Sequence, residues 1–138
     1  MACMESHEGG CLCRAVRYRV TGSPLHTVIC HCETCRKAAA AAAPSMAWIT
    51  CARENFQIFF GTPRGFRSSP GVLRTFCENC GSPLTYASNQ WPGEIDVTTL
   101  SMDDSLLFPP TREIWLEDRI TWEVLNPERQ QISRGGGE

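Results

Sequence analysis

The sequence lacks three features that would each assign it to a broad class of protein. It has no surplus of basic residues, because 13 Lys and Arg stand against 15 Asp and Glu for a formal net charge of −2. This balance argues against a sequence-independent nucleic-acid-binding protein. It also has no run of the roughly 18 apolar residues that a membrane span needs. The charge-free stretch over residues 38–52 is shorter than that and contains Pro44. We therefore expect neither nucleic acid nor a membrane as a partner.

The first residues also lack the apolar segment of a secretory signal peptide. Residues 1–10 include Glu5, His7 and Glu8, and we therefore expect no signal peptide and a reduced, cytoplasmic protein. The chain nevertheless has nine cysteines, an odd number that cannot be fully paired within one chain. In a reducing compartment, clustered cysteines favour metal binding or catalysis over disulfides.

The length and composition predict one folded domain. The chain has 138 residues, of which 42% are hydrophobic and 9% aromatic. This is enough for a core, too apolar for a disordered protein, and too short for a second domain of ordinary size. We expect the domain to span residues 9–126. Residues 1–8 would form a loose N-terminal tail, and the polar residues 127–138 a flexible C-terminal tail.

Alternating apolar residues predict a mainly β domain with one short helix. The predicted strands cover residues 15–20, 28–29, 46–50, 56–60, 72–76, 84–87, 95–100, 113–117 and 120–125. Residues 61–71 are rich in Gly, Pro and Ser and are expected to form a loop. The alanine-rich residues 33–43 predict the helix, which Pro44 would end.

Two pairs of cysteines have the spacing of zinc ligands. Cys11 and Cys13 form C-x-C, whereas Cys77 and Cys80 form C-x-x-C followed by Gly81. The C-x-x-C spacing lets a tight turn present two thiolates to one ion, and the glycine supplies the left-handed residue of that turn. If the two pairs share a zinc ion, they form a closed, structural site. That ion would tie the first predicted strand to the middle of the chain.

A third group of cysteines supplies only three ligands. Cys30, Cys32 and Cys35 form C-x-C-x-x-C at the start of the predicted helix. Three protein ligands and an open fourth position are typical of catalytic zinc, and the helix start would help to stabilise thiolates. Two other interpretations remain open. Cys32 and Cys35 could be a redox dithiol, or the group could hold an iron–sulfur cluster, although the C-x2-C-x2-C run of ferredoxins is absent.

Five further residues carry weaker signals. We expect Cys3 to be a free thiol in the tail and Cys51 a small buried apolar residue. His31 lies between two candidate ligands and could be a hydrogen-bond donor to them or an acid–base group. We favour instead a histidine that points to solvent, because its neighbours point inward. For Tyr86 and Trp91, packing in the core or at its rim is favoured over lining a pocket.

Taken in order, these motifs resemble those of the glutathione-dependent formaldehyde-activating enzyme family, also called the GFA or CENP-V domain. The resemblance extends from about residue 9 to residue 125. The residues that carry it are Gly10-Cys11-Leu12-Cys13, Ala15-Val16, Tyr18, Cys30-His31-Cys32, Cys35-Arg36-Lys37, Gly61, Ser68-Ser69, Arg74, Phe76-Cys77, Cys80-Gly81-Ser82, Leu100, Asp103-Asp104, Ile114-Trp115 and Trp122.

The resemblance implies a fold, two zinc ions per chain and an activity. The fold would be a β-tent, a folded-over β structure held by zinc. The activity would be that of a carbon–sulfur lyase, the reversible addition of glutathione to formaldehyde to give S-hydroxymethylglutathione. The resemblance also implies that the structural zinc is bound by Cys11, Cys13, Cys77 and Cys80, and the catalytic zinc by Cys30, Cys32 and Cys35.

The sequence departs from the family pattern at two places. Arg14 replaces a glycine of the first motif, and alanines at 38–43 replace the Ser-Gly that commonly follows Arg36-Lys37. The second departure alters the surroundings of the catalytic zinc and therefore bears on the substrate. A non-enzymatic zinc-binding module that engages a protein is the alternative function. If the substrate is an anionic peptide thiol, the candidate residues to bind its charge are Arg36, Lys37, Arg64 and Arg67.

Overall fold

The computed structural model describes residues 4–41 and 43–135, and these residues form two β-sheets and one α-helix. The mainly β class predicted from the sequence is confirmed. The helix α1 spans Glu33–Ala39. The strands are β1 Ser6–Gly10, β2 Arg17–Thr21, β3 His26–Cys30, β4 Met46–Ala52, β5 Phe56–Phe60, β6 Arg64–Ser69, β7 Val72–Phe76, β8 Pro83–Ser88, β9 Glu94–Thr98, β10 Arg112–Ile114 and β11 Gln130–Gln131.

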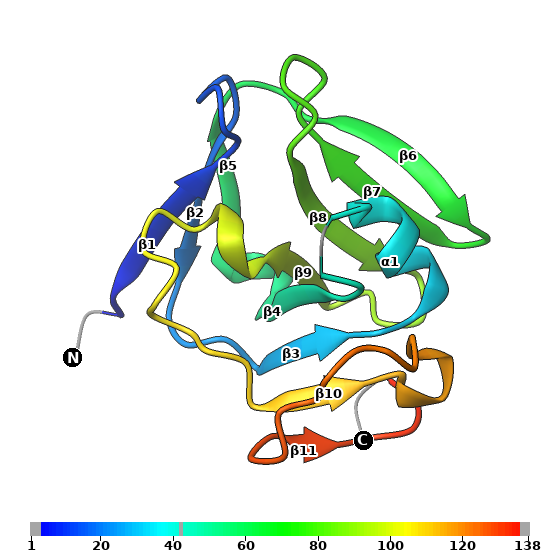
Figure 1. Ribbon diagram of the computed structural model, residues 1–138. Coiled ribbons are helices and arrows are strands. Elements are labelled where there is room, and N and C mark those ends of the chain that lie inside the picture. Colours follow the sequence, from blue (N-terminus) through cyan, green and yellow to red (C-terminus); the bar gives the residue numbers. More distant parts are fainter. Residues whose placement is uncertain (1–3, 42, 136–138) are drawn as a thin grey trace.

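The two sheets differ in size and lie at an angle to each other (Figure 1). The smaller sheet is antiparallel, with the order β1-β2-β5. The larger sheet has the order β11-β10-β3-β4-β9-β8-β7-β6, and its strands from β3 to β6 are antiparallel neighbours. Consecutive strands pair in β1-β2, β3-β4 and β6-β7-β8-β9, whereas the pairs β2–β5, β4–β9 and β3–β10 join segments that lie far apart in sequence.

The main core lies between the two sheets. Tyr18 and Val20 of β2 pack there against Ile49 of β4, Leu84 of β8 and Val97 of β9, and all five are almost completely buried. A buried hydroxyl needs a hydrogen-bond partner, and the Tyr18 hydroxyl lies 2.7 Å from the Ser101 hydroxyl. Burial also raises the pKa of Tyr18. Cys51 is buried in this core, as predicted.

The opposite face of the larger sheet carries a second cluster of buried residues. Successive side chains of a strand point to opposite faces, so Trp48 and Met46 of β4 lie away from Ile49. They pack with Val28 and with Cys30 and Cys35. Helix α1 lies over this face, on the right in Figure 1.

Helix α1 is shorter than the predicted helix over residues 33–43. It begins at Cys32, whose Sγ accepts a hydrogen bond from the Cys35 amide at 3.3 Å. It ends at Ala40, which has a left-handed conformation with φ of 47°. Proline disfavours helical conformation at the residue before it, so the chain must leave the helix ahead of Pro44. In the described part of the chain, no helix has the length and apolar character to cross a bilayer.

Several predicted boundaries are wrong because strand pairing overrides local composition. Strand β6 lies within the predicted loop 61–71, where it forms an exposed edge next to β7. Residues 6–8, expected in the N-terminal tail, pair with β2. Residues 120–125 form no strand. The partner of β10 is instead β11, which lies in the expected C-terminal tail and pairs with it in parallel. Cys3 lies outside the described residues.

A buried polar network joins β10 to the end of β3. His31 is fully buried, and its Nε2 lies 2.6 Å from Oε1 of Glu113. Arg129 donates to Oε2 of Glu113 at 3.0 Å, and the Asn126 amide donates to the same oxygen. Burial alone would raise the pKa of Glu113, but these hydrogen bonds outweigh it and lower the pKa. The prediction that His31 points to solvent is wrong, because its backbone leaves β3 alongside Ile114 and turns the ring inward.

Replacing Glu113 by Ala should lower the free energy of unfolding by about 3 kcal/mol, because it leaves the partners of a buried carboxylate unsatisfied. Urea unfolding followed by circular dichroism measures this change. Glu128→Ala is the matched control, since Glu128 is exposed and lies in the same C-terminal segment. Equal midpoints for the two variants would show that the network does not stabilise the fold.

Candidate functional site

The first two cysteine pairs converge into one cluster of four sulfur atoms. The Sγ atoms of Cys11, Cys13, Cys77 and Cys80 all lie within 4.8 Å of one another. The Sγ of Cys13 is 3.7 Å from that of Cys11 and 3.7 Å from that of Cys77. Tetrahedral zinc with bonds of ~2.3 Å to sulfur requires sulfur–sulfur distances of ~3.8 Å. The cluster therefore fits a zinc ion.

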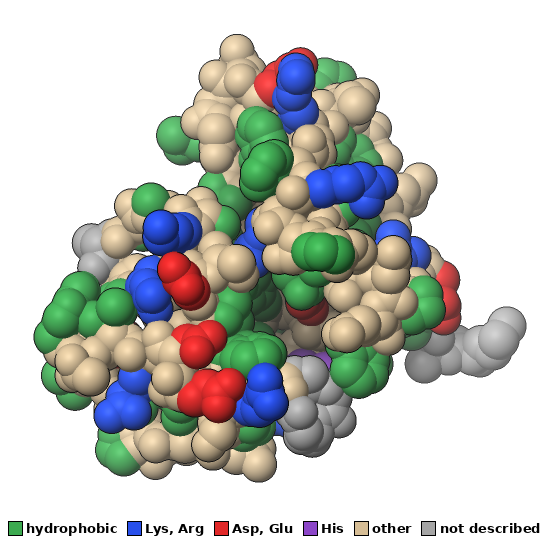
Figure 2. Space-filling view, turned by 90° about the vertical axis from the view of Figure 1, so that its right-hand side faces the viewer, with side chains coloured by type: hydrophobic (Ala, Val, Ile, Leu, Met, Phe, Trp, Pro, Cys, Tyr) green, Lys and Arg blue, Asp and Glu red, His purple; other side chains and the backbone are tan. Residues whose placement is uncertain are grey.

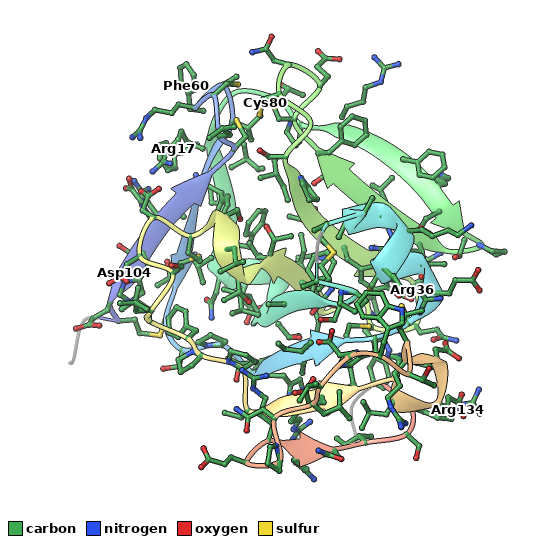
Figure 3. The ribbon with its side chains drawn as sticks, viewed as in Figure 1. Arg17, Arg36, Phe60, Cys80, Asp104 and Arg134 are labelled. Atoms are coloured by element: carbon green, nitrogen blue, oxygen red, sulfur yellow. The ribbon has the colours of Figure 1, made fainter. Side chains whose placement is uncertain are left out.

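The four-cysteine cluster lies where the two sheets meet. Cys11 and Cys13 follow β1, and Cys77 and Cys80 lie between β7 and β8. Figure 3 shows Cys80 near the top of the molecule, far from Arg36 on α1. Hydrogen bonds favour the thiolate form of two of these four cysteines. Asn79 donates to Cys13 Sγ at 3.2 Å and lowers the pKa of Cys13, and the hydrogen bond with Ser82 lowers the pKa of Cys80 to about 5.

The structure shows why the family pattern has a glycine at the position that Arg14 occupies in this chain. Arg14 has a φ of 68°, a left-handed conformation that favours glycine. Its amide donates to the Cys11 carbonyl oxygen at 3.1 Å, which closes the turn that presents the first two sulfurs. Arginine therefore occupies a position where a glycine would be unstrained, and the turn keeps its shape.

The remaining three cysteines form the second cluster, here called the triad. Cys30 ends β3, Cys32 caps α1 and Cys35 lies in the first turn of α1. Their sulfur atoms also lie within 4.8 Å of one another, and Cys30 and Cys35 are buried. Hydrogen bonds from Cys30 and Cys35 lower the pKa of Cys32 to about 2, whereas the contact with Cys32 raises the pKa of Cys30. The triad thus favours a thiolate and fits a metal ion that prefers sulfur ligands, such as zinc.

The triad forms part of the wall of a cavity of about 850 Å³. The side of the molecule that carries α1 and β6 is seen in Figure 2, where the surface is hollowed near its centre. Tyr86 and Trp91 line this cavity, so the packing role favoured for them from the sequence does not describe them fully. Trp48 and Trp115 add two more aromatic walls.

Asp96 is a lining residue of this cavity that the sequence analysis missed. Its Oδ1 accepts a hydrogen bond from Thr50 Oγ1 at 2.6 Å. Burial raises the pKa of Asp96 to about 6. The Thr50 hydrogen bond and the positive charge of Arg74 oppose this increase, whereas the negative charge of Glu94 adds to it. The available signal was a lone acidic residue between the two buried core residues Ile95 and Val97. Such a residue must face the other side of the sheet.

Arg74 is a second residue whose role the sequence did not reveal. Its Nη2 lies 3.5 Å from Cys35 Sγ, and its guanidinium stacks 4.9 Å from the centre of the Tyr86 ring. Of the basic residues predicted to bind an anionic substrate, Arg36 donates to the Asp118 carbonyl oxygen and Arg64 pairs with Glu78.

Three comparisons with known proteins agree with this architecture. A model of the family described as "Glutathione-dependent formaldehyde-activating enzyme" matches residues 6–118. A curated protein of Halomonas elongata named "Putative glutathione-dependent formaldehyde-activating enzyme" is 30% identical over 132 residues, which cover 89% of this chain and 83% of that protein. An "Uncharacterized lyase" of Schizosaccharomyces pombe is 33% identical over 84 residues, which cover 61% of this chain and 59% of that protein.

A solved structure shares the fold. A crystal structure of a Rhodobacter sphaeroides protein superimposes with a TM-score of 0.60 at 19% sequence identity. The superposition covers 75% of this chain and 97% of that protein.

The purified protein should contain two zinc ions per chain, one for each sulfur cluster. Elemental analysis of protein purified under reducing conditions measures this ratio. Cys51→Ala is the matched control and should keep both ions, since Cys51 lies in the core and in neither cluster. Iron in place of zinc, or one zinc with a reversible Cys32–Cys35 disulfide, would contradict the assignment of both clusters to zinc.

Proposed function

Because this chain belongs to the glutathione-dependent formaldehyde-activating enzyme family, we propose that it is a zinc-dependent carbon–sulfur lyase that reversibly adds a thiol such as glutathione to formaldehyde or a related small aldehyde. The observation that carries this proposal is the position of the triad in the wall of a cavity. Three sulfur ligands beside open space can accept one more ligand, whereas a four-sulfur cluster cannot.

The two clusters then have different roles. Cys11, Cys13, Cys77 and Cys80 would hold a structural zinc, and their four sulfurs complete its coordination. The triad would hold the catalytic zinc. When bound there, zinc would stabilise the thiolate form of an incoming thiol at neutral pH.

Asp96 is the residue that we propose for proton transfer. The thiol loses its proton when it binds as a thiolate, and the Asp96 carboxylate accepts this proton. The sulfur–carbon bond then forms as the carbon–oxygen π bond breaks, and Asp96 gives a proton to the former carbonyl oxygen, so all atoms of thiol and aldehyde remain in the hydroxymethyl product. Asp96 supports this role because it lines the same cavity as the triad and is only partly buried there. The aromatic walls limit the access of water to this exchange.

Cys80→Ser should unfold the domain, whereas Cys35→Ser should leave it folded and inactive. The four-cysteine cluster joins residues about seventy positions apart, so its loss releases a long segment of chain. The triad lies within six residues. Thermal unfolding followed by circular dichroism, with the zinc content of each variant, measures the difference. Equal collapse of the two variants would show that the triad is also structural.

A free thiol should bind at the triad, and its binding should strengthen as the pH rises from about 6 to about 8. Binding as a thiolate releases a proton, and this costs less near the thiol's own pKa of about 8.5. S-methylglutathione has no such proton and only a thioether sulfur, so it should bind poorly throughout this range. Calorimetry with both ligands tests this. Equal affinity of the two would favour the non-enzymatic binding module.

Asp96→Asn should lower the maximal rate of thiol–formaldehyde exchange about 100-fold, within the usual range for general acid–base catalysis. Asp96 is protonated below its pKa of about 6 and can accept a proton only above it, so the rate should rise as the pH passes through about 6. Asparagine cannot accept a proton, and this rise should disappear while thiol binding persists. Exchange-transfer NMR at several pH values measures the rate.

Glu94→Gln is the matched control for this measurement, because Glu94 is the neighbouring carboxylate on the same strand and lines the same cavity. It should keep the rise near pH 6, shifted slightly to lower pH because a negative neighbour is lost. An unchanged pH profile in Asp96→Asn would assign proton transfer to another group.

A further inference from the structure

A second cavity, of about 450 Å³, adjoins the cavity of the triad. Glu33, Thr34 and Trp48 line both, so the two cavities meet beside the start of α1. Most of the second cavity is apolar, and two cations, Lys37 and Arg74, line it. Its apolar walls are formed by Ala38, Met46, Phe66, Phe76 and Pro83.

Arg74 is a buried cation whose charge is not neutralised by a carboxylate. Only 7% of the residue is exposed. Its Nε donates to Ser68 Oγ at 3.0 Å and its Nη2 to Thr34 Oγ1 at 3.2 Å, and both hydroxyls also line the second cavity. Its Nη1 is buried without a hydrogen-bond partner, and among the described residues no carboxylate forms an ion pair with it. A buried guanidinium normally has an anionic partner.

Two anions could neutralise Arg74. One is the triad, whose Cys35 Sγ lies 3.5 Å from Nη2. The other is a ligand in the second cavity. The cavity itself favours the second source, because Lys37 adds another positive charge at an exposed position and the lining contains one carboxylate, the exposed Glu33. The hydroxyls of Ser68 and Thr34 can donate hydrogen bonds to a carboxylate that approaches the guanidinium.

We infer that the second cavity binds the carboxylate of a ligand, with Arg74 and Lys37 as its partners and the apolar walls around its carbon chain. The next step rests on the proposed function. The ligand is then the thiol substrate, whose sulfur lies at the triad and whose carboxylate lies past Thr34 in the second cavity. The residue that would bind the substrate carboxylate is thus Arg74, whose guanidinium also lies 3.5 Å from Cys35 Sγ of the triad.

The test compares two thiols of equal length, 3-mercaptopropionate and 3-mercaptopropanol, by calorimetry with the zinc-loaded protein. The acid should bind at least 10-fold more tightly than the alcohol. Arg74→Gln should remove this preference without weakening the alcohol, and Arg74→Lys should retain part of it. Arg19→Gln removes the same charge from the smaller sheet and should retain all of it.

Lys37→Gln gives an independent test if Arg74→Gln does not fold, because Lys37 is exposed on α1 and its replacement removes little packing. It should reduce the preference for the acid several-fold. Equal affinity of the acid and the alcohol for the unaltered protein would overturn the inference. The inference would also be overturned if Arg74→Gln lost the zinc of the triad but still bound the acid more tightly than the alcohol. Arg74 would then support the triad and not a carboxylate site.

A probe without a thiol separates this inference from the proposed function. If neither thiol binds at the triad, the proposed function fails, but 3-phenylpropionate should still shift the NMR signals of Thr34, Lys37 and Phe66. Arg74→Gln should abolish these shifts. A different result would refute the carboxylate site and leave the proposed function standing. In that result, thiols bind at the triad, 3-phenylpropionate shifts no signals, and the acid binds no more tightly than the alcohol.

Discussion

The alternation of side chains along β4 and β9 is the constraint on which both the core and the site depend. Ile49 and Val97 point to the side of the smaller sheet and form the main core. Trp48 and Asp96 point to the other side and line the cavity of the triad. Because the side-chain period of a strand is two, a shift of one residue in register would move every one of these side chains to the wrong face. The same hydrogen bonds that hold the sheet therefore also place the polar groups of the site.

Pairing between strands brings together polar residues that lie far apart in sequence. Thr50 of β4 is opposite Asp96 of β9, Asp96 is opposite Tyr86 of β8, and Tyr86 is opposite Arg74 of β7. In this row, the carboxylate and the guanidinium lie on either side of one aromatic ring. Arg74 stacks on the ring and reaches Cys35, while Asp96 is hydrogen-bonded to Thr50. The two charges are thus held at fixed positions beside the cavities without neutralising each other directly.

The cysteine clusters and most strands could be predicted because their signals are local. C-x-C and C-x-x-C spacings are set by the geometry of single turns, and residues such as Ile95 and Val97 reveal a strand by alternation alone. Strand β6 carried no such signal, because an exposed edge strand buries few side chains on either face. The parallel pair of β10 and β11 depends on a contact between segments sixteen or more residues apart. Composition in the tail does not encode that contact.

The site residues that were missed share one physical reason. Asp96 and Arg74 each occupy an ordinary strand position, and their surroundings depend on which strands lie next to them. His31 was placed wrongly because alternation was extended past the end of β3. There the chain is no longer a regular strand, and its amide bonds to the Ile114 carbonyl oxygen. Local pattern thus located the sulfur atoms, whereas the charged groups that line the cavities beside them could be found only from the sheet order.

The two sulfur clusters also differ in how they depend on the rest of the fold. The four-cysteine cluster draws its ligands from both sheets, so its geometry exists only when the sheets have come together. The triad draws its ligands from six consecutive residues, from the end of β3 to the first turn of α1, so the closeness of its sulfurs depends on local structure. Its cavity and its neighbours Arg74 and Asp96, in contrast, come from β7 and β9. A metal ion could therefore leave or enter the triad without breaking the contact between the sheets, while the groups that give the site its chemistry are fixed by the larger sheet. Separating the ligand turn from the supporting sheet in this way lets the triad exchange ligands on a fold that does not have to open.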